Sequence, residues 1–169
     1  MRVYLPTTAS RLAAAVAAGE VDAPVHAVTP AVREWYVEGD QEELEFAALT
    51  EAAQGSLRLL AEGGPEPDPA RRLVLAADVD DASVGTWPDA PHRSLARLLR
   101  PVPWRRVVSL HVDEDAAQDA VRAAIAALPA ADAGDDDALF LLDEAGACDL
   151  LWYDVTEVDE VLRDLRHTR

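Results

Sequence analysis

The segment from Thr29 to Leu60 constrains the fold most, because two helix starts follow one another within it. Thr29 precedes Pro30, which is the arrangement of an N-cap residue and a proline at the first helical position, where no backbone N–H is needed. Gly39 comes a few residues later and is typical of a helix end. The sequence therefore predicts a short helix that begins after Thr29 and is ended by Gly39.

A second, longer helix is predicted directly after the first. Asp40 and Glu43 have the spacing of a capping box, in which each side chain accepts a hydrogen bond from the backbone N–H of the other residue. Apolar side chains then recur at intervals of three and four, which places them on one helical face. These residues are Phe46, Leu49, Ala53, Leu57 and Leu60. Such a face has to be buried, and the strands predicted on either side are its partners.

The remainder of the chain alternates between predicted strands and helices. Short apolar runs predict strands over residues 2–5, 25–28, 72–77, 106–112, 138–142 and 149–153. Helices are predicted from a cap at Thr7 or Thr8 through Ala18, over residues 115–128, and after a cap at Thr156. The last two strands are joined through residues 143–146, a turn-prone connection that indicates an antiparallel hairpin. Residues 94–100 fit a helix, an edge strand or a turn, and the segments 62–69 and 85–93 are expected to be irregular.

This mixture of elements predicts an α+β fold in which residues 1–169 form a single globular domain. We expect a two-layer sandwich in which a mixed sheet carries helices mainly on one face. The strands are short, some neighbours in sequence are joined by helices, and one pair forms a hairpin. A ferredoxin-like plait with the helical pair of residues 29–60 inserted is one arrangement that fits.

The charge balance bears on the partners of the chain. Fifteen basic residues, all of them arginine, stand against 32 acidic ones, for a net charge of -17. A chain this negative repels phosphate backbones and anionic lipid, which argues against general binding of nucleic acid or of a membrane surface. We expect most of the acidic residues to form a well-solvated surface.

Cysteine usage and hydropathy predict a cytoplasmic location. Cys148 is the only cysteine, so the chain can form neither an internal disulfide nor a cysteine-based zinc site. The apolar run Leu12–Ala18 is too short and too rich in alanine to be the core of a signal peptide. No segment reaches the ~18 apolar residues that a transmembrane helix needs.

The common catalytic motifs are absent from the sequence. It contains no G-x-G-x-x-G, no P-loop pattern, no H-E-x-x-H and no G-x-S-x-G. Because the chain has no lysine, it can form no Schiff base through lysine and no P-loop lysine contact. We therefore expect no catalytic residue, no metal and no cofactor, and we interpret the acidic residues as helix caps and strand ends.

One group of side chains supports an alternative interpretation as a metal-binding or acid–base site. Asp78 and Asp81 follow the predicted strand 72–77, while His111 and Asp113 lie at the end of the predicted strand 106–112. If these strands are neighbours whose ends meet, the four side chains approach one another. Oxygen ligands with one imidazole suit Mg²⁺ or Mn²⁺.

Aromatic residues form the preferred candidate binding surface. Trp35-Tyr36 and Trp152-Tyr153 are two Trp-Tyr pairs that each lie beside a carboxylate, and Trp87 lies in a proline-bracketed segment. Neighbouring residues point to opposite faces of a strand and lie about 100° apart on a helix, so one member of each pair is expected to be the more exposed. Aromatic side chains on such segments are typical of surfaces that bind other proteins.

Several stretches of the chain resemble a known family. They are RVYLP, AVTPAVREWYVEGDQEELEFAALTEAA, LVLAADVDDASV, VVSLHVDED and DLLWYDVTEVDEVL, and together they extend over nearly the whole chain. They are similar to a family of small actinobacterial proteins catalogued as a domain of unknown function, and EWYVEGDQEELEFAAL is the most specific part. The resemblance implies cytoplasmic residence and a single domain, and it implies no activity, cofactor or catalytic residue.

Together these observations predict a non-catalytic, soluble cytoplasmic module that binds another protein, with self-association left open. Two alternatives remain. One is a small divalent-metal-dependent or acid–base enzyme that uses the clustered aspartates, and the other is an acidic mimic of nucleic acid that occupies a basic protein surface. The enzyme requires the acidic side chains to converge, whereas the binding module requires exposed aromatic side chains.

Overall fold

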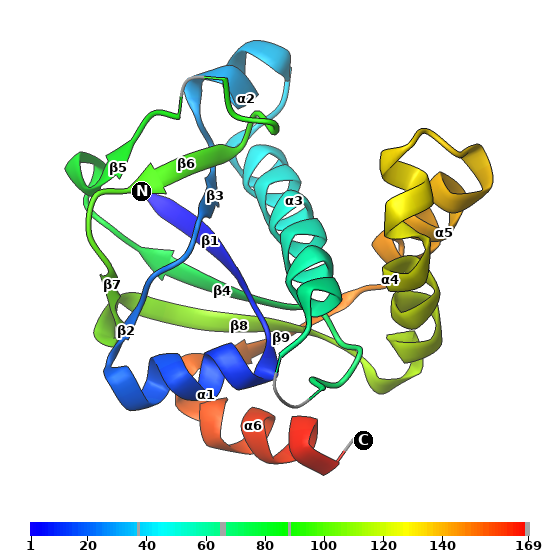
Figure 1. The fold of residues 1–169 in the computed structure, drawn as a ribbon. Helices are drawn as coiled ribbons and strands as arrows, with labels where there is room; N and C mark the ends of the chain where they lie inside the picture. The colour runs from blue at the N-terminus through cyan, green and yellow to red at the C-terminus, as the bar shows by residue number, and fades with distance from the viewer. Residues whose placement is uncertain (37, 65–66, 88, 168–169) are drawn as a thin grey trace.

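One antiparallel sheet organises the structure (Figure 1). The computed structural model describes residues 1–36, 38–64, 67–87 and 89–167. Within these residues, seven strands pair in the order β5-β6-β3-β1-β4-β8-β9, and each of these pairs is antiparallel. The strands are β1 (Arg2–Thr7), β3 (Val25–Ala27), β4 (Leu73–Asp78), β5 (Val84–Gly85), β6 (Leu95–Leu98), β8 (Val107–Asp113) and β9 (Leu150–Asp154). Two short strands, β2 (Glu20–Val21) and β7 (Val102–Pro103), pair with each other.

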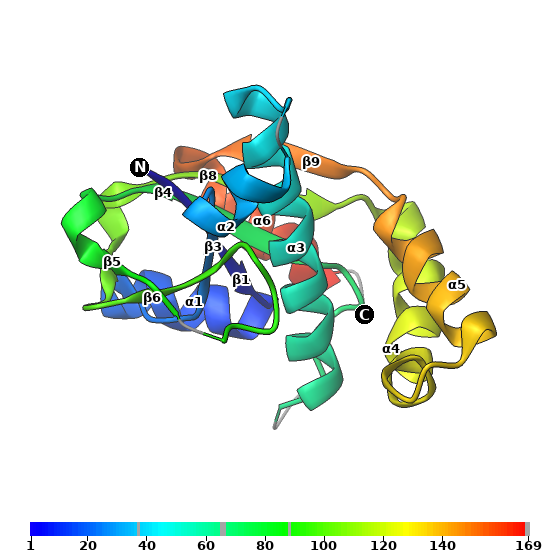
Figure 2. The ribbon, with the colours of Figure 1, turned by 90° about the horizontal axis from the view of Figure 1, so that it is seen from above.

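Helices cover both faces of this sheet. They are α1 (Ala9–Ala18), α2 (Pro30–Trp35), α3 (Gln41–Glu62), α4 (Gln118–Asp132), α5 (Asp136–Gly146) and α6 (Val158–His167), with 3₁₀ turns η1 (Asp81–Ser83), η2 (Trp104–Arg106), η3 (Asp115–Ala117) and η4 (Val155–Glu157). α1 and α6 pack against one face, where Leu12 and Leu165 join Leu5 of β1 in the core. α3 packs against the opposite face through Ala48 and Ala52. α4 and α5 pack against each other and lie to one side of α3 (Figure 2).

The α+β class is confirmed, and the arrangement within it differs from the predicted one. Among the described strands the sheet is antiparallel rather than mixed, and the helices are divided between its two faces. A ferredoxin-like plait places a strand between two strands that a helix joins. Here α1 joins β1 to β3, α4 and α5 join β8 to β9, and the strands of each pair are direct neighbours. The structure is therefore not a ferredoxin-like plait.

Both predicted helix starts in the segment 29–60 are present. The hydroxyl of Thr29 caps α2 by accepting a hydrogen bond from the backbone three residues later. Asp40 and Glu43 form the predicted capping box, with carboxylate-to-nitrogen distances of 2.9 and 3.1 Å. α2 ends at Trp35, however, so Gly39 is not the residue that stops it. Local capping chemistry thus determined the helix starts, and the first helix is shorter than predicted.

Of the face predicted for α3, Ala53 and Leu57 are buried as expected, and Phe46 is not. Ala48 and Ala52 are fully buried against the sheet, whereas Phe46 is 70% exposed. The reason is the close approach of the helix to β1, since a Cβ atom added at Gly55 would lie 3.1 Å from the ring of Pro6. The predicted face is therefore wrong at Phe46, because small residues allow a helix to lie this close to a sheet.

The segment before β9 departs most from the predicted elements. Residues 138–142 lie within α5 and form no strand, so the predicted hairpin is wrong. The aspartates 135–137 provide the N-cap and the acidic first turn of this helix, which favours it electrostatically. Ala138 and Ala145 face inward while Phe140 is 60% exposed. An apolar run of strand length was thus half of an amphipathic helix.

Smaller differences concern two helix ends. α4 continues through Pro129 to Asp132, beyond the predicted end of that helix. A capping box formed by Asp154 and Glu157 precedes α6, where a cap at Thr156 was predicted. In both places the existence of the helix is as predicted and its boundary is shifted.

The segments expected to be irregular have mixed outcomes. Residues 94–100, which fitted either a helix or a strand, contain β6. The segments 62–69 and 85–93 include residues 65–66 and 88, which lie outside the described part of the chain. The remaining residues of the second segment bound the pocket described next.

Candidate binding surface

An apolar pocket lies between α2 and the segment that runs from β5 to β6. Its volume is about 430 Å³, which falls within the roughly 300–1,000 Å³ typical of ligand pockets. Side chains from both elements line it: Val28, Pro30, Ala31, Val84, Trp87 and Leu95. Because this lining is apolar, the pocket can receive an apolar group whose transfer out of water drives binding.

Hydrogen bonds join the two walls of the pocket. The hydroxyl of Thr29, which caps α2, also donates to the backbone carbonyl of Arg93. The backbone N–H of Ala27 donates to the carbonyl of Ser94 at 2.8 Å, which extends the pairing of β3 with β6 up to the pocket. The walls are therefore held in place by the fold, and such preorganisation lowers the cost of binding.

Two arginine–tryptophan stacks flank the pocket. The guanidinium of Arg93 lies 3.7 Å from the ring centroid of Trp35, and that of Arg97 lies 5.3 Å from the ring centroid of Trp87. Cation–π contacts of this kind are worth about 0.5–1 kcal/mol each at exposed sites. Neither guanidinium forms an ion pair with any residue that the structure describes. Both charges are thus available to a carboxylate at the rim.

The chain beside this pocket is basic although the chain as a whole is acidic. Residues 93–106 contain five arginines and no acidic residue. They are Arg93, Arg97, Arg100, Arg105 and Arg106. Acidic groups from elsewhere temper this charge, since Asp89 lines the pocket and Glu51 pairs with His92 at 3.1 Å. Of the five arginines, Arg93 lines the pocket and Arg97 stacks on Trp87. The other three border a separate depression, where Arg106 pairs with Asp80 at 3.6 Å.

The structure separates the aromatic candidates instead of gathering them on one surface. Trp35 and Trp87 flank the pocket, while Tyr36 lines a separate open depression of about 750 Å³ at the start of α3. Trp152 and Tyr153 lie on β9, at the opposite edge of the sheet. Trp35 and Trp152 are each 61% exposed and Tyr36 is 48% exposed, whereas Tyr153 packs against the core.

The candidate metal ligands are divided between the two ends of a strand pair. β4 and β8 are neighbours, as a metal site would require, but they are antiparallel. Asp78 and Asp81 follow one end of the pair, whereas His111 and Asp113 lie toward the other end. Among the residues that the structure describes, no group of three or more His, Cys, Asp or Glu side chains is placed to hold a metal ion. The structure therefore does not bring these four residues together.

Asp113 is fully buried and is compensated by Arg72. Its carboxylate accepts hydrogen bonds from the Arg72 guanidinium at 2.7 Å and from the Arg72 backbone N–H at 2.6 Å. Arg72 also donates to the carbonyl of Cys148, and Arg71 donates to the carbonyl of Asp113 and pairs with Asp164 of α6. This network connects β4, β8, the approach to β9 and α6. It was not predicted, although two arginines directly before an apolar strand are a signal, because a buried guanidinium requires a buried carboxylate.

The other candidate ligands are each engaged by a different partner. Arg2 donates two hydrogen bonds to Asp78, at 2.7 and 3.0 Å, and these bonds lower the pKa of that carboxyl. Asp81 pairs with the N-terminal amine at 2.9 Å. His111 Nε2 lies 3.2 Å from Ser109 Oγ, and burial, followed by the charge of Arg2, lowers the pKa of the imidazole. Each of these groups is therefore occupied in a local interaction.

A buried polar pair next to the pocket was also not predicted. His26 Nδ1 and Ser94 Oγ are 2.7 Å apart, and the two residues are 3% and 2% exposed. Burial, followed by the nearby His92, lowers the pKa of His26 to about 4. The imidazole is thus neutral at neutral pH, and a substrate cannot reach a serine this deeply buried. The only signal in the sequence is a histidine within an apolar strand, so the pair is best understood as a link between β3 and β6.

The fold and the pocket define an antiparallel α+β protein with an apolar, arginine-flanked cavity at one edge of its sheet. Residues 1–162 match the family described as a family of unknown function (DUF6912), and the chain belongs to this family. This bears out the resemblance to a family of unknown function, while the actinobacterial origin stays a prediction. No curated protein and no solved structure matches the chain. Among the described residues, none of the helices combines the length and the hydrophobicity needed to cross a bilayer.

Proposed function

We propose that the chain is a non-catalytic protein-binding module whose pocket at Trp87 receives an apolar side chain of a partner, next to an acidic group of that partner. The observation that carries the proposal is a pocket that is apolar inside and flanked by the Arg93–Trp35 and Arg97–Trp87 stacks. Tryptophan and arginine are the residues in which binding energy concentrates at protein interfaces.

The charges around the pocket define the chemistry of the partner. Arginine binds carboxylates with two parallel hydrogen bonds, and Arg93 and Arg97 beside the pocket form no ion pair with any residue that the structure describes. Burial of the apolar side chain would provide most of the affinity, while the arginines would accelerate association and make it depend on salt. The expected ligand is therefore a peptide segment in which a bulky apolar residue lies beside Asp or Glu.

The alternatives have less support. Asp78 and Asp113 are compensated by arginines at opposite ends of β4, which speaks against an enzyme built on clustered aspartates. Mimicry of nucleic acid draws on net charge alone, and no arrangement of the described residues favours it. A cytoplasmic location, expected from the lone Cys148, accords with the proposal.

A peptide selection tests the proposal. Random peptides selected on the unmodified protein should converge on an apolar residue beside Asp or Glu. Trp87→Ala should weaken a selected peptide by at least about tenfold, as truncation of an interface anchor does. Arg93→Ala should have a smaller effect that disappears at high salt.

Trp152→Ala is the control for this selection, because it removes a tryptophan from the opposite edge of the sheet. It should leave the selected peptides unaffected. Selected peptides that bind Trp87→Ala as tightly as the unmodified protein would exclude the pocket as their site. A consensus without an acidic residue would remove the role of the arginines.

A further inference from the structure

The opposite edge of the sheet ends in an exposed strand. β9 is the last strand in the sheet order, and Figure 2 shows it on the outer side of β8. Leu151 and Trp152 in this strand are 42% and 61% exposed. Within β9, no charged residue precedes Asp154. Edge strands are usually protected from pairing by charges or proline within the strand, and four successive positions of β9 lack both.

Hydrogen-bond alternation shows which backbone groups of β9 point outward. The N–H of Asp113 donates to the carbonyl of Arg72, so this residue of β8 directs its backbone groups toward β4. In an antiparallel strand the direction alternates, so the neighbouring Val112 faces β9. Its register partner is Leu151, whose backbone groups therefore face β8. The residues on either side of Leu151 direct theirs away from the sheet.

The end of the strand supports the same assignment independently. The N–H of Asp154 donates to the Glu157 carboxylate at 2.8 Å. In a strand every second residue directs its backbone groups the same way. Trp152 and Leu150, two and four positions before Asp154, therefore also direct theirs outward. Among the described strands none lies on that side of β9. The backbone groups of Leu150 and Trp152 are therefore free to pair with an added strand.

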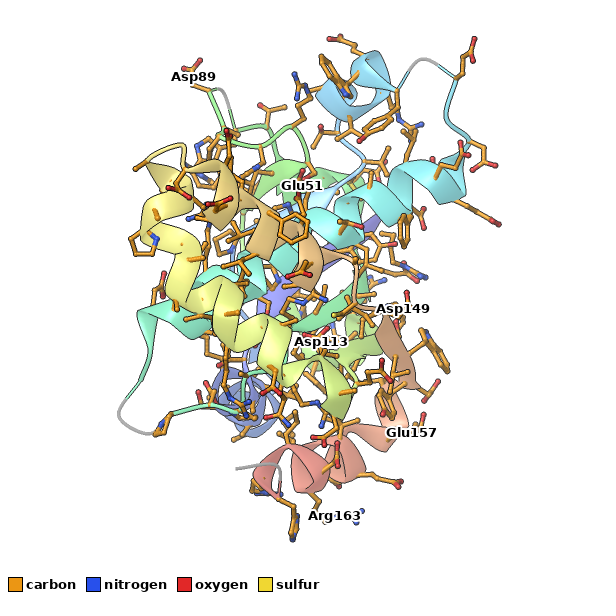
Figure 3. All side chains as sticks on the ribbon, turned by 90° about the vertical axis from the view of Figure 1, so that its right-hand side faces the viewer. Glu51, Asp89, Asp113, Asp149, Glu157 and Arg163 are labelled. Atoms are coloured by element: carbon orange, nitrogen blue, oxygen red, sulfur yellow. The ribbon has the colours of Figure 1, made fainter. Side chains whose placement is uncertain are left out.

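The part of the chain that contains β9 is negative along the sequence. Residues 123–162 contain eleven acidic residues and no basic residue. They are Asp132, Asp135, Asp136, Asp137, Asp143, Glu144, Asp149, Asp154, Glu157, Asp159 and Glu160. Figure 3 shows Asp149 and Glu157 near the two ends of β9. Because like charges on adjacent strands destabilise a sheet and opposite charges stabilise it, these acids disfavour an added acidic strand and favour a basic one.

A second copy of this chain is disfavoured at the same edge. Antiparallel pairing of β9 with itself, centred on Trp152, would place Asp154 of each copy opposite Leu150 of the other and would bring together the acidic residues that flank the two strands. Pairing of β9 with the opposite edge would use β5, which has only two residues (Val84–Gly85). Self-association therefore either creates repulsion or forms few backbone hydrogen bonds.

We propose that the edge of β9 binds an extended, basic segment of a partner protein by strand addition. The backbone of the partner pairs with the outward N–H and C=O groups of Leu150 and Trp152. Its basic side chains lie close to Asp149 and the acids that follow β9, and one of them stacks on the exposed ring of Trp152. This surface is separate from the pocket at Trp87, and either can bind without the other.

A blocked hexapeptide of alternating arginine and valine is the probe. Amide shifts in NMR spectra should change at β9 and its immediate neighbours when the peptide is added. N-methylation of alternate peptide nitrogens removes strand hydrogen bonds and keeps the charge, so it should weaken binding by about tenfold or more. Trp152→Ala should weaken it several-fold, and Trp87→Ala should leave it unchanged. A matched glutamate–valine peptide should not bind at β9.

Several results would overturn strand addition at this edge. N-methylated and unmodified peptides of equal affinity would mean that charge alone attracts the probe. Shift changes centred on the Trp87 pocket, or no binding at millimolar peptide, would also exclude it. Sedimentation that finds a dimer without peptide, lost on Leu150→Pro, would assign the edge to a second copy instead.

Discussion

The two edges of the sheet carry similar aromatic groups in opposite electrostatic surroundings. Trp35 and Trp152 are each 61% exposed. The segment 93–106 beside the first has five arginines and no acid, whereas the segment 123–162 around the second has eleven acids and no base. The net charge of -17 describes neither edge. Inferences about partners therefore have to be drawn from the local charge of each edge.

The centre of the sheet differs from both edges, because its charges are used within the protein. Arg72 and Asp113 are 1% and 0% exposed and satisfy each other. At the other end of β4, Arg2 and Asp78 form a pair that remains partly exposed. The comparison predicts large effects on stability for changes at the centre and small ones at the edges, with the reverse order for binding.

Breaking the buried pair should have the largest effect on stability. Asp113→Asn keeps the shape of the side chain but leaves the Arg72 guanidinium buried without its counter-charge. Removal of one partner of a buried ion pair costs about 3–5 kcal/mol in free energy of unfolding, measurable by urea denaturation. Asp78→Asn, at the exposed end of β4, should cost at most about 1 kcal/mol. Equal losses for the two variants would refute the distinction between centre and edge.

The buried His26 should make stability depend on mildly acidic pH. Its pKa is about 4 in the folded protein, against an ordinary value of 6.5, so between these values the unfolded chain binds the proton and the native chain does not. Stability should therefore fall as pH drops from 6.5 to 4, by about 3 kcal/mol in total. The pKa of Asp78 is also lowered, so its contribution to stability is lost only below pH 3.8, the ordinary pKa of this carboxyl.

The variant His26→Gln isolates this contribution in urea titrations at a series of pH values. Its profile should be flatter than that of the unmodified protein between pH 6.5 and 4. His167→Gln is the control, because His167 is exposed and lies on α6 instead of beside His26. Parallel profiles for His26→Gln and the unmodified protein would show that burial of His26 does not control this region of pH.

Loss of the exposed tryptophans should have the smallest effect on stability. Trp35→Ala removes one exposed stack with Arg93 and should cost about 0.5–1 kcal/mol in free energy of unfolding. Trp152→Ala removes no such contact and should change it by about 0.5 kcal/mol or less. Thermal or urea unfolding measures both. A loss above about 2 kcal/mol in either variant would mean that the side chain serves the fold instead of a partner.

The features that were predictable from the sequence depend on residues close together in the chain. Thr29 with Pro30 and Asp40 with Glu43 are local capping patterns, and both form as predicted. The direction of β8 relative to β4 depends on the whole topology and not on nearby residues. The strand ends that carry the candidate metal ligands were therefore predicted to meet, but they lie at opposite ends of the strand pair. The run 138–142 has the length of a strand, and packing against α4 determines that it is helical.

The candidate binding surface was only partly predictable, because it combines residues that are far apart in the chain. Trp35, Trp87 and Trp152 stand out as aromatic residues in the sequence, but the pocket exists only because β6 and α2 are brought together. The stacks with Arg93 and Arg97 likewise cross between elements. Arg93 and Arg97 were visible in the sequence, but their place beside an apolar pocket follows only from the fold.

A paired titration tests the central claim, that the two edges are independent binding surfaces of opposite charge preference. Calorimetry would compare Trp87→Ala and Trp152→Ala, each against a pocket-selected acidic peptide and against the arginine–valine hexapeptide. We expect Trp87→Ala to weaken only the acidic peptide, and Trp152→Ala to weaken only the basic one. If either variant weakened both peptides equally, or neither, the two edges would not be the separate surfaces described here.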